Sequence, residues 1–290
     1  MAAVYLNGEF LPADQACIPV LDRGFIFGDG VYEVIPVYGG RLFRLDEHLQ
    51  RLRNSLHAVR IPEPLGDADW RTLLEELVAR NHGGEQSIYL QVTRGSAQRD
   101  HAMPEHPEPT VFAMSSPLHP VSAEIREHGV AAITLDDIRW QRCHIKAISL
   151  LPNILLRQQA LDQGAAEAIL VRDGLATEGA ASNLFIVSDD TLITPPTGPL
   201  LLPGITRDLI LELAETNGIP HREHDIRHEQ LRDADEIWLT SSTKEILPVT
   251  RLDDRPVADG SPGPLYRRML ALYQDYKQHL RDQHTMATES

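Results

Sequence analysis

Four pairs of turn-forming residues, each lying between two short apolar runs, constrain the fold of this chain most strongly. Two-residue hairpin turns need the left-handed backbone conformation, which Asn, Asp and Gly tolerate best. The sequence therefore predicts four β-hairpins, two in each half of the chain, and the sheets that they imply. The turns are centred on Asn7-Gly8, Gly39-Gly40, Asp173-Gly174 and Asp189-Asp190.

Helical periodicity separates these hairpins. In two segments, residues 46–61 and 68–81, apolar residues recur every three or four positions, a spacing that places them on one face of a helix. Proline at the start and glycine at the end predict a third helix over residues 152–164. The predicted helices span residues 46–61, 68–81, 152–164, 204–218 and 263–280. Further strands are predicted over residues 87–95, 110–116 and 129–137, and the segment 235–243 is predicted to be a strand that runs into a hydroxyl-rich loop.

The order of these elements predicts two domains. Hairpins and two helices give residues 1–115 the pattern of a small α+β domain. A polar, proline-bearing linker follows over 116–122, and residues 123–284 form a second, larger domain. We expect the polar tail, residues 285–290, to be disordered.

Charge and composition exclude several classes of function. The formal net charge of −15 argues against nucleic acid or an anionic membrane as a partner, because both attract a basic surface. Cys17 and Cys143 have neither the spacing of a metal site nor that of a disulfide framework, which favours a reducing compartment. The sequence has neither a run long enough to span a bilayer nor a signal-like start, so we expect a cytoplasmic protein.

Lys146 is the most informative candidate for chemistry. Only three of the 27 basic residues are lysines, and Lys244 and Lys277 both lie in polar contexts that predict solvated side chains. Lys146 instead lies in a strand-like apolar run, where burial favours the neutral, nucleophilic amine. The alternative is a lysine that extends from a half-buried strand to solvent.

A candidate anion site lies further along the chain. In "LLPGITRDLILELAE" a glycine precedes a helix whose first turn holds Ile205 and Thr206, so that free N–H groups and a hydroxyl favour a phosphate. Ser241, Ser242 and Thr243 follow a predicted strand and add hydroxyl donors. Helix capping and turn formation are the alternative uses of these residues.

A reactive lysine together with a phosphate site points to pyridoxal phosphate, whose aldehyde forms a Schiff base with lysine. Its ring withdraws electrons best when the ring nitrogen is protonated, and this requires an adjacent carboxylate. Glu178 lies at the end of a predicted strand, before Gly179 and other small residues that allow a flat ring to approach.

With these residues in this order, the chain resembles the fold-type IV pyridoxal-phosphate enzymes, the class IV aminotransferases, and among them the D-amino-acid transaminases most. The resemblance runs from "YLNGEF" to "KEILPV" through the motifs "DRGFIFGDGVYEVIPVYGG", "HLQRLRNS", "TRGSAQRDH", "KAISLLPN", "EGAASNLFIV", "LLPGITR" and "TSSTKEI". It implies a two-domain α+β or α/β fold, with a small N-terminal α/β domain and a larger C-terminal domain with a β-barrel-like core.

The resemblance also implies roles for the cofactor site. Lys146 would carry the cofactor and move the proton, Glu178 would pair with the ring nitrogen, and Arg51 would bind phosphate. Ile205, Thr206 and Ser242 would complete the phosphate site. The alternative for Arg51 is a plain amphipathic helix, with Arg51 and Arg53 on its solvated side.

Tyr32, Arg99 and His101 match the residues that hold the substrate α-carboxylate in D-amino-acid transaminases. A guanidinium, a phenol and an imidazole together suit a carboxylate. The resemblance implies that Arg99 and His101 reach the site of a neighbouring subunit in a homodimer. Where D-transaminases often carry serines, this chain has Ala180 and Ala181, which removes hydroxyl groups near the cofactor or substrate. We expect the cofactor chemistry to survive this change.

The implied activity is transfer of an amino group from a D-amino acid such as D-alanine to a 2-oxo acid such as 2-oxoglutarate, with ping-pong kinetics through pyridoxamine phosphate. Alternatives of the same fold are a branched-chain L-amino-acid aminotransferase, an (R)-amine transaminase and an aminodeoxychorismate lyase. A cofactor-free Schiff-base enzyme, such as an aldolase, would leave the phosphate site and Glu178 unused.

A metal site is the alternative from another class. "HREHDIRH" places His221, His224 and His228 where they share one face if the segment is helical. The 13 histidines of the chain make such clusters common by chance, so we expect no metal.

Overall fold

The chain folds into two compact units. The computed structural model describes residues 2–288, and the side chains of residues 2–282. The first unit holds the residues up to His119, Ile145–Ser149 and those from Lys277 onward; the second holds Pro120–His144 and Leu150–Tyr276. The chain thus first passes from one unit to the other inside the segment predicted as a linker, and the segment with Lys146 belongs to the first unit.

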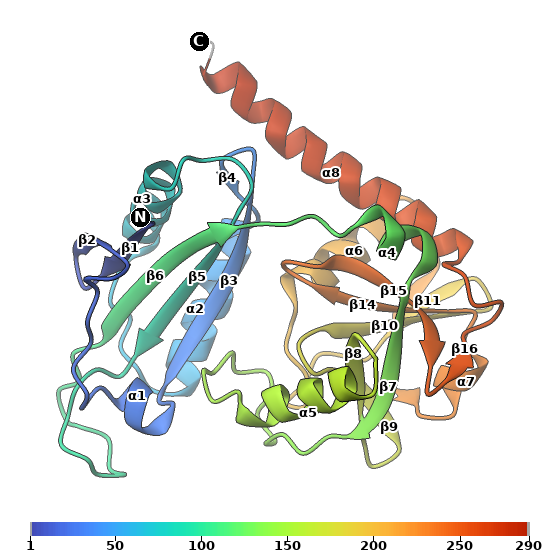
Figure 1. Cartoon of the computed structure of the whole chain (residues 1–290), viewed down its shortest axis with the longest axis horizontal. Helices are drawn as coiled ribbons and strands as arrows, with labels where there is room; N and C mark the ends of the chain where they lie inside the picture. Colours follow the sequence, from blue (N-terminus) through green and yellow to red (C-terminus); the bar gives the residue numbers. More distant parts are fainter. Residues whose placement is uncertain (1, 289–290) are drawn as a thin grey trace. The chain divides into compact units, whose positions relative to one another are not determined.

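A six-stranded sheet forms the first unit, with the order β2-β1-β6-β5-β3-β4 (Figure 1). Every neighbouring pair in it is antiparallel. The strands are β1 (Ala3–Leu6), β2 (Glu9–Pro12), β3 (Gly30–Tyr38), β4 (Arg41–Leu42), β5 (Gln86–Thr93) and β6 (Thr110–Pro117).

Two helices pack on this sheet because their apolar faces complete its core. Val31 and Ile35 of β3 are fully buried in one cluster with Leu49 and Leu52 of α2 and Leu74 of α3. Burial of such side chains supplies the main free energy of folding. The helices of the unit are α1 (Arg23–Phe27), α2 (Leu45–Ala58) and α3 (Asp67–Arg80).

A larger sheet forms the second unit, with the path β12-β11-β10-β14-β15-β7-β8-β9-β13 and β16 paired to β15. The N–H of Gly179 at the end of β9 donates to the carbonyl of Ser182 just before β10. Since β9 and β10 lie far apart on the path, the sheet must curl to bring them together. The β-barrel-like core expected of this unit is thereby confirmed as a curled sheet.

The strands of the second unit are β7 (Val130–Asp136), β8 (Glu167–Arg172), β9 (Leu175–Gly179), β10 (Asn183–Ser188), β11 (Thr191–Thr194), β12 (His221–Glu223), β13 (Ile226–Arg227), β14 (Glu236–Ser241), β15 (Glu245–Leu252) and β16 (Arg255–Pro256). Its helices are α4 (Ala123–His128), α5 (Leu151–Asp162), α6 (Ile205–Thr216) and α7 (Gln230–Asp233). The last helix, α8 (Pro264–Thr288), begins in this unit. Residues 285–288 of the predicted tail belong to α8, and residues 289 and 290 lie outside the described residues.

All four predicted hairpins are confirmed. They join β1 to β2, β3 to β4, β8 to β9 and β10 to β11 in antiparallel pairs. Both central residues of each turn have positive φ, for example 46° at Asn7 and 101° at Gly8. This backbone twist matches that of the paired strands, so the turn residues decide where the chain reverses.

Two interpretations of the lysines are wrong. Lys277 was expected in solvent, but it is only 3% exposed and its Nζ lies 4.2 Å from the centroid of the Tyr38 ring. Lys146 was expected in a strand, but it lies in an irregular segment that meets β3 through an isolated bridge between Val31 and Ala147. Aromatic contact explains the first case, since a ring face attracts an ammonium group.

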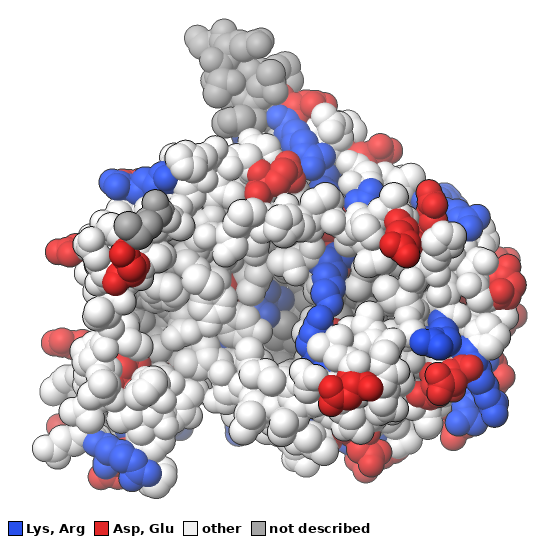
Figure 2. Space-filling model, viewed as in Figure 1, with Lys and Arg blue, Asp and Glu red and all other residues white. Residues whose placement is uncertain are grey.

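Charged side chains of both signs lie on the surface of the protein. Figure 2 shows one face, on which Lys and Arg side chains are interspersed with Asp and Glu side chains. Within residues 2–288, no helix is long and apolar enough to cross a membrane.

Candidate active site

Backbone hydrogen bonds along β3 position Lys146. The N–H of Tyr32 donates to the carbonyl of Lys146 at 2.9 Å, and the N–H of Ile148 donates to the carbonyl of Gly30 at 3.1 Å. The N–H of Lys146 itself donates to Oγ of Ser55 on α2 at 3.2 Å. The segment is therefore fixed to both the sheet and the helix of the first unit.

The amine of Lys146 lies over an aromatic ring. Its Nζ is 4.3 Å from the centroid of Tyr32, and the ring of Tyr32 stacks on that of Tyr89 with centroids 5.6 Å apart. Burial raises the pKa of Tyr89 to about 12, so its hydroxyl stays protonated and donates to Gln91. Lys146 and Tyr32, which the sequence proposed for different tasks, are thus neighbours.

A buried ion pair holds Arg51. Nε and Nη2 of Arg51 donate to the two carboxylate oxygens of Glu33 at 2.8 and 2.7 Å. Nδ1 of His48 lies 2.7 Å from the same carboxylate. Burial alone would raise the pKa of Glu33, but Arg51 and then His48 lower it to about 2. The alternative that put Arg51 on the solvated face of its helix is wrong, since Arg51 is 6% exposed.

The register of β3 and α2 explains this ion pair. Glu33 shares the core-facing side of β3 with Val31 and Ile35, because alternate residues of a strand point the same way. His48, Arg51 and Ser55 recur at helical spacing on α2 and are all buried. Sequence reasoning missed Glu33, although a carboxylate among apolar strand residues was a visible signal.

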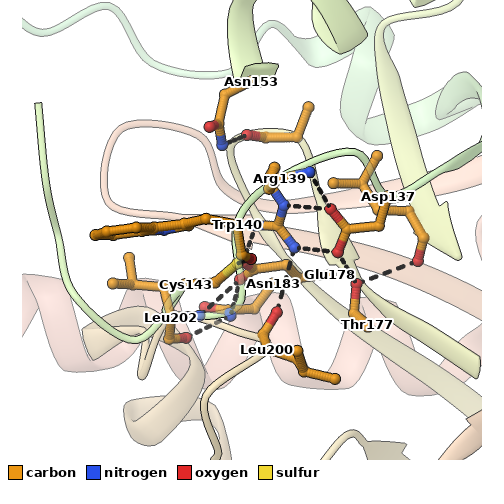
Figure 3. A network of polar contacts seen from close by, with 12 residues as sticks. Asp137, Arg139, Trp140, Cys143, Asn153, Thr177, Glu178, Asn183, Leu200 and Leu202 are labelled. Carbon is orange, nitrogen blue, oxygen red and sulfur yellow. Dashed lines mark hydrogen bonds and ion pairs between the residues drawn. The ribbon is translucent and has the colours of Figure 1, made fainter. Parts of the chain in front are cut away.

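Glu178, at the end of β9 in the second unit, lies in a network of polar contacts (Figure 3). Its Oε1 pairs with Nη1 of Arg139. Its Oε2 accepts hydrogen bonds from Nδ2 of Asn183 at 3.1 Å and from the N–H of Leu202 at 3.0 Å. Burial raises the pKa of Glu178 to about 7, although Arg139 opposes this rise.

Asp137 fixes Arg139 in turn. Nε and Nη2 of Arg139 donate to the two oxygens of Asp137, both at 2.9 Å, and Nη2 also reaches the carbonyl of Leu200 (Figure 3). Such a two-point contact fixes the plane of the guanidinium. Sequence reasoning missed Arg139, Asp137 and Asn183, because nothing in their local sequence sets them apart.

Asn183 links Glu178 to the start of α6. A Cβ added to Gly204 would lie 1.8 Å from Oδ1 of Asn183, so no larger residue fits there. Among the described side chains none caps α6, whose first residues Ile205 and Thr206 are buried. The first-turn N–H groups of such a helix are available to an anion.

The hydroxyl-rich loop starts beside Asn183. Thr240 lies opposite Asn183 in the pairing of β14 with β10. Its Oγ1 is buried and has no hydrogen-bond partner among the described residues, and the half-buried Ser242 follows two positions later. The carboxylate of Glu178, the start of α6 and the hydroxyl of Thr240 thus all lie close to Asn183. Such a carboxylate suits a ring nitrogen, and the helix start and the hydroxyl suit a phosphate.

Arg99 and His101 form a separate group in the first unit. Both are exposed, in the loop between β5 and β6. The Cζ of Arg99 and the ring centroid of His101 each lie 5.5 Å from the ring centroid of Phe27. Phe27 is therefore a shared platform for two residues proposed to bind one carboxylate.

The residue pattern around these sites matches a known family. The model of the family "Amino-transferase class IV" matches residues 30–252. The chain belongs to the class IV aminotransferases. This family assignment confirms that the protein is an aminotransferase, and the resemblance inferred from the sequence motifs is confirmed with it.

Relatives and solved structures agree with this membership. The chain is 41% identical to a D-alanine aminotransferase of Bacillus licheniformis, over 94% of this chain and 96% of that protein. It is 37% identical to a D-alanine aminotransferase of Staphylococcus epidermidis, over 96% of this chain and 99% of that protein.

The fold is similar to that of the branched-chain amino acid aminotransferase of Escherichia coli, with a TM-score of 0.88, 29% identity and 92% of each chain covered. It is also similar to the PLP-bound form of a hypothetical aminotransferase from Mycobacterium tuberculosis, with a TM-score of 0.81, 29% identity, and 93% and 97% of the two chains covered. The predicted fold class is thereby confirmed.

The histidine-rich segment does not form the helical face on which its metal alternative depended. His221 begins the strand β12, and His228 follows the strand β13. Among the described side chains, those of residues 2–282, no group of three or more His, Cys, Asp or Glu is arranged to hold a metal ion.

Proposed function

We propose that this aminotransferase uses pyridoxal phosphate to move the amino group of a D-amino acid, such as D-alanine, to a 2-oxo acid such as 2-oxoglutarate. The observation that carries the D-amino-acid assignment is the pair Arg99 and His101, both 5.5 Å from the ring of Phe27. The names of the relatives at 37% and 41% identity support it.

Lys146 is the proposed catalytic residue. When bound, pyridoxal phosphate would supply an electron sink for the substrate α-carbon. Nζ of Lys146 takes the α-proton as a general base. The hydrogen bonds of its segment to β3 and Ser55 hold the lysine backbone still, and Tyr32 lies against the amine.

Six residues are proposed to hold the cofactor. Glu178 keeps a proton on the ring nitrogen, a task suited to a carboxylate that Arg139 and Asn183 fix in place. The N–H groups at Ile205 and Thr206 and the hydroxyl of Ser242 bind phosphate. The cofactor-binding set is Arg51, Lys146, Glu178, Ile205, Thr206 and Ser242.

Tyr32, Arg99 and His101 are proposed to bind the substrate α-carboxylate. In this fold type the hand of the substrate follows from where that carboxylate is anchored, so these residues decide between D- and L-amino acids. The branched-chain amino acid aminotransferase among the structural neighbours, at 29% identity, makes an L-branched-chain substrate the second candidate.

We also propose a homodimer in which Arg99 and His101 serve the neighbouring subunit. Large exposed apolar side chains support this assembly, because such patches mark protein interfaces. In the first unit Val20 is 74% and Phe25 is 70% exposed. In the second, Leu151 and Ile154 of α5 are 66% and 61% exposed. Both cysteines are free, in accord with a cytoplasmic location.

The test compares three amino donors with the wild-type enzyme and Arg99→Ala. D-alanine should react much faster than L-leucine with the wild type. Arg99→Ala should lower kcat/KM for D-alanine by about 10- to 100-fold, the effect of losing hydrogen bonds to a charged group. Turnover of (R)-1-phenylethylamine, which has no carboxylate, should be spared.

The matched control is Arg71→Ala, since Arg71 is a half-exposed arginine that pairs with Asp46 on the surface of the same unit. It should leave all three donors unchanged. Preference for L-leucine would move the assignment to the branched-chain enzymes. Equal loss of D-alanine and amine turnover in Arg99→Ala would remove the carboxylate role of Arg99.

A further inference from the structure

Arg23 in α1 joins the loop that carries Arg99 and His101 to the body of the first unit. Nη1 of Arg23 donates to the carbonyl of Asp100 at 2.6 Å and to that of Ala102 at 3.3 Å. These carbonyls belong to the residues on both sides of His101. Among the described residues, Arg23 supplies the hydrogen bonds that reach the backbone of residues 98–103 from outside that segment.

Asp29 and Arg94 anchor Arg23. Nε of Arg23 pairs with Oδ2 of Asp29 at 2.8 Å, and Arg94 donates to both oxygens of the same carboxylate at 2.8 and 2.9 Å. Arg94 in turn donates to the carbonyls of Val59 and Arg60, each at 2.7 Å. Burial alone would raise the pKa of Asp29, but the hydrogen bonds from Arg94 and Arg23 outweigh it and lower the pKa.

The anchoring residues are buried, whereas the loop that they hold is exposed. Arg23 is 5% and Arg94 is 2% exposed, whereas Arg99 and His101 are exposed. The guanidinium of Arg23 also lies over the ring of Phe27, with Cζ 4.8 Å from the centroid. Arg23 therefore fixes the loop backbone and the aromatic platform at once.

We propose that Arg23, anchored by Asp29 and Arg94, is a positioning residue that sets the affinity for the substrate α-carboxylate by fixing the loop of Arg99 and His101. This rests on the proposed function of those two residues. Exposed loop residues bind a small anion well only if their backbone is already ordered, since ordering it during binding costs free energy. The guanidinium of Arg23 is occupied by Asp29 and by two carbonyls of the loop, so Arg23 acts on the substrate through the loop.

The test uses Arg23→Gln and Arg23→Lys in the full-length enzyme. Lysine keeps a positive charge near Asp29 but lacks the fork that reaches Asp29 and two carbonyls together. Arg71→Gln is the matched control. Hydrogen exchange of residues 98–103 reports order in the loop, and initial rates with D-alanine and (R)-1-phenylethylamine report binding and chemistry. Far-UV circular dichroism verifies that each variant is folded.

We expect faster hydrogen exchange at 98–103 in both Arg23 variants, and a KM for D-alanine raised about tenfold with kcat changed much less. The KM for the amine should stay within about twofold, a split that a general loss of structure would not produce. Unchanged exchange in a folded Arg23 variant, or an unchanged KM for D-alanine despite faster exchange, would overturn the proposal.

Failure of the proposed function gives a different result. A wild-type enzyme that does not convert D-alanine would refute the substrate assignment and, with it, the affinity role of Arg23. The exchange measurement would then still decide whether Arg23 orders the loop.

Discussion

Arg139 donates a hydrogen bond to Oε1 of Glu178, a residue 39 positions later in the chain. The contact joins a guanidinium that Asp137 fixes to a carboxylate that is 4% exposed. Burial favours the protonated acid and Arg139 favours the carboxylate, and the balance leaves the pKa of Glu178 at about 7. A carboxyl poised in this way can share a proton with a basic ring nitrogen.

We predict that Glu178→Gln removes a pH dependence from the stability of the cofactor-free protein. Because the pKa of Glu178 is raised from 4.5 to about 7, the folded protein keeps a proton that the unfolded chain loses between these values. The contribution of this carboxyl to stability therefore falls as the pH rises through that window. Between the lower and the upper pH of this window, the free energy of unfolding of the wild type should fall by up to about 3 kcal/mol more than that of the variant. Urea unfolding at several pH values measures this difference.

Glu76→Gln is the control for this series, because Glu76 lies on the exposed side of α3 in a surface pair with Arg80. If the free energies of unfolding of the wild type and Glu178→Gln differ by the same amount at every pH in this window, the raised pKa of Glu178 is contradicted.

Gly204→Ala should weaken cofactor binding. The new methyl group would lie 1.8 Å from Oδ1 of Asn183, so Asn183 must move away from Glu178 and from the start of α6. We expect destabilisation of about 1–3 kcal/mol from overpacking. Thermal unfolding and titration of the cofactor-free protein with pyridoxal phosphate measure the two effects.

The paired control is Gly198→Ala, because a Cβ at Gly198 meets nothing within 4 Å. Equal affinities of Gly204→Ala and Gly198→Ala for pyridoxal phosphate would show that Asn183 does not organise the site.

Glu33→Gln should be strongly destabilising at neutral pH. It leaves the buried Arg51 without its carboxylate, and breaking a buried ion pair in this way costs about 3–5 kcal/mol. Since the pKa of Glu33 is lowered to about 2, its stabilisation is present above the ordinary value of 4.5 and is lost as the pH falls through about 2. The difference in the free energy of unfolding between the wild type and Glu33→Gln should therefore become smaller at acidic pH.

Chemical denaturation across this pH range tests the prediction, with Asp46→Asn as the exposed counterpart. Asp46 pairs with Arg71 at the surface, where solvent screens the charges and the loss is small. A Glu33→Gln variant as stable as Asp46→Asn would mean that the buried pair does not hold α2 to β3.

The sequence predicted the local parts of the fold well, because their signals are local. Turn pairs such as Gly39-Gly40 and Asp173-Gly174 mark hairpins because each lies between two short strand-like runs. The curl of the larger sheet was beyond such reasoning, since it depends on Gly179 meeting Ser182 while β7 pairs in parallel with both β8 and β15. The β-barrel-like core came from the family resemblance alone.

Short motifs reveal some of the site residues, whereas others are recognisable only once the fold is known. Lys146, Glu178 and the start of α6 are recognisable from short motifs. Arg139 and Asn183 gain their meaning only from a partner that the fold brings near. Lys277 misled the sequence interpretation because a polar helix position gives no sign of the Tyr38 ring that covers it.

The most direct test of the account is to locate the lysine that binds the cofactor. Borohydride reduction of the enzyme loaded with pyridoxal phosphate fixes the lysine linkage as a stable amine, and mass spectrometry of the digest identifies the modified peptide. With only Lys146, Lys244 and Lys277 in the chain, the outcome is unambiguous. We predict modification at Lys146; modification at Lys244 or Lys277 instead, or none at all, would contradict the account.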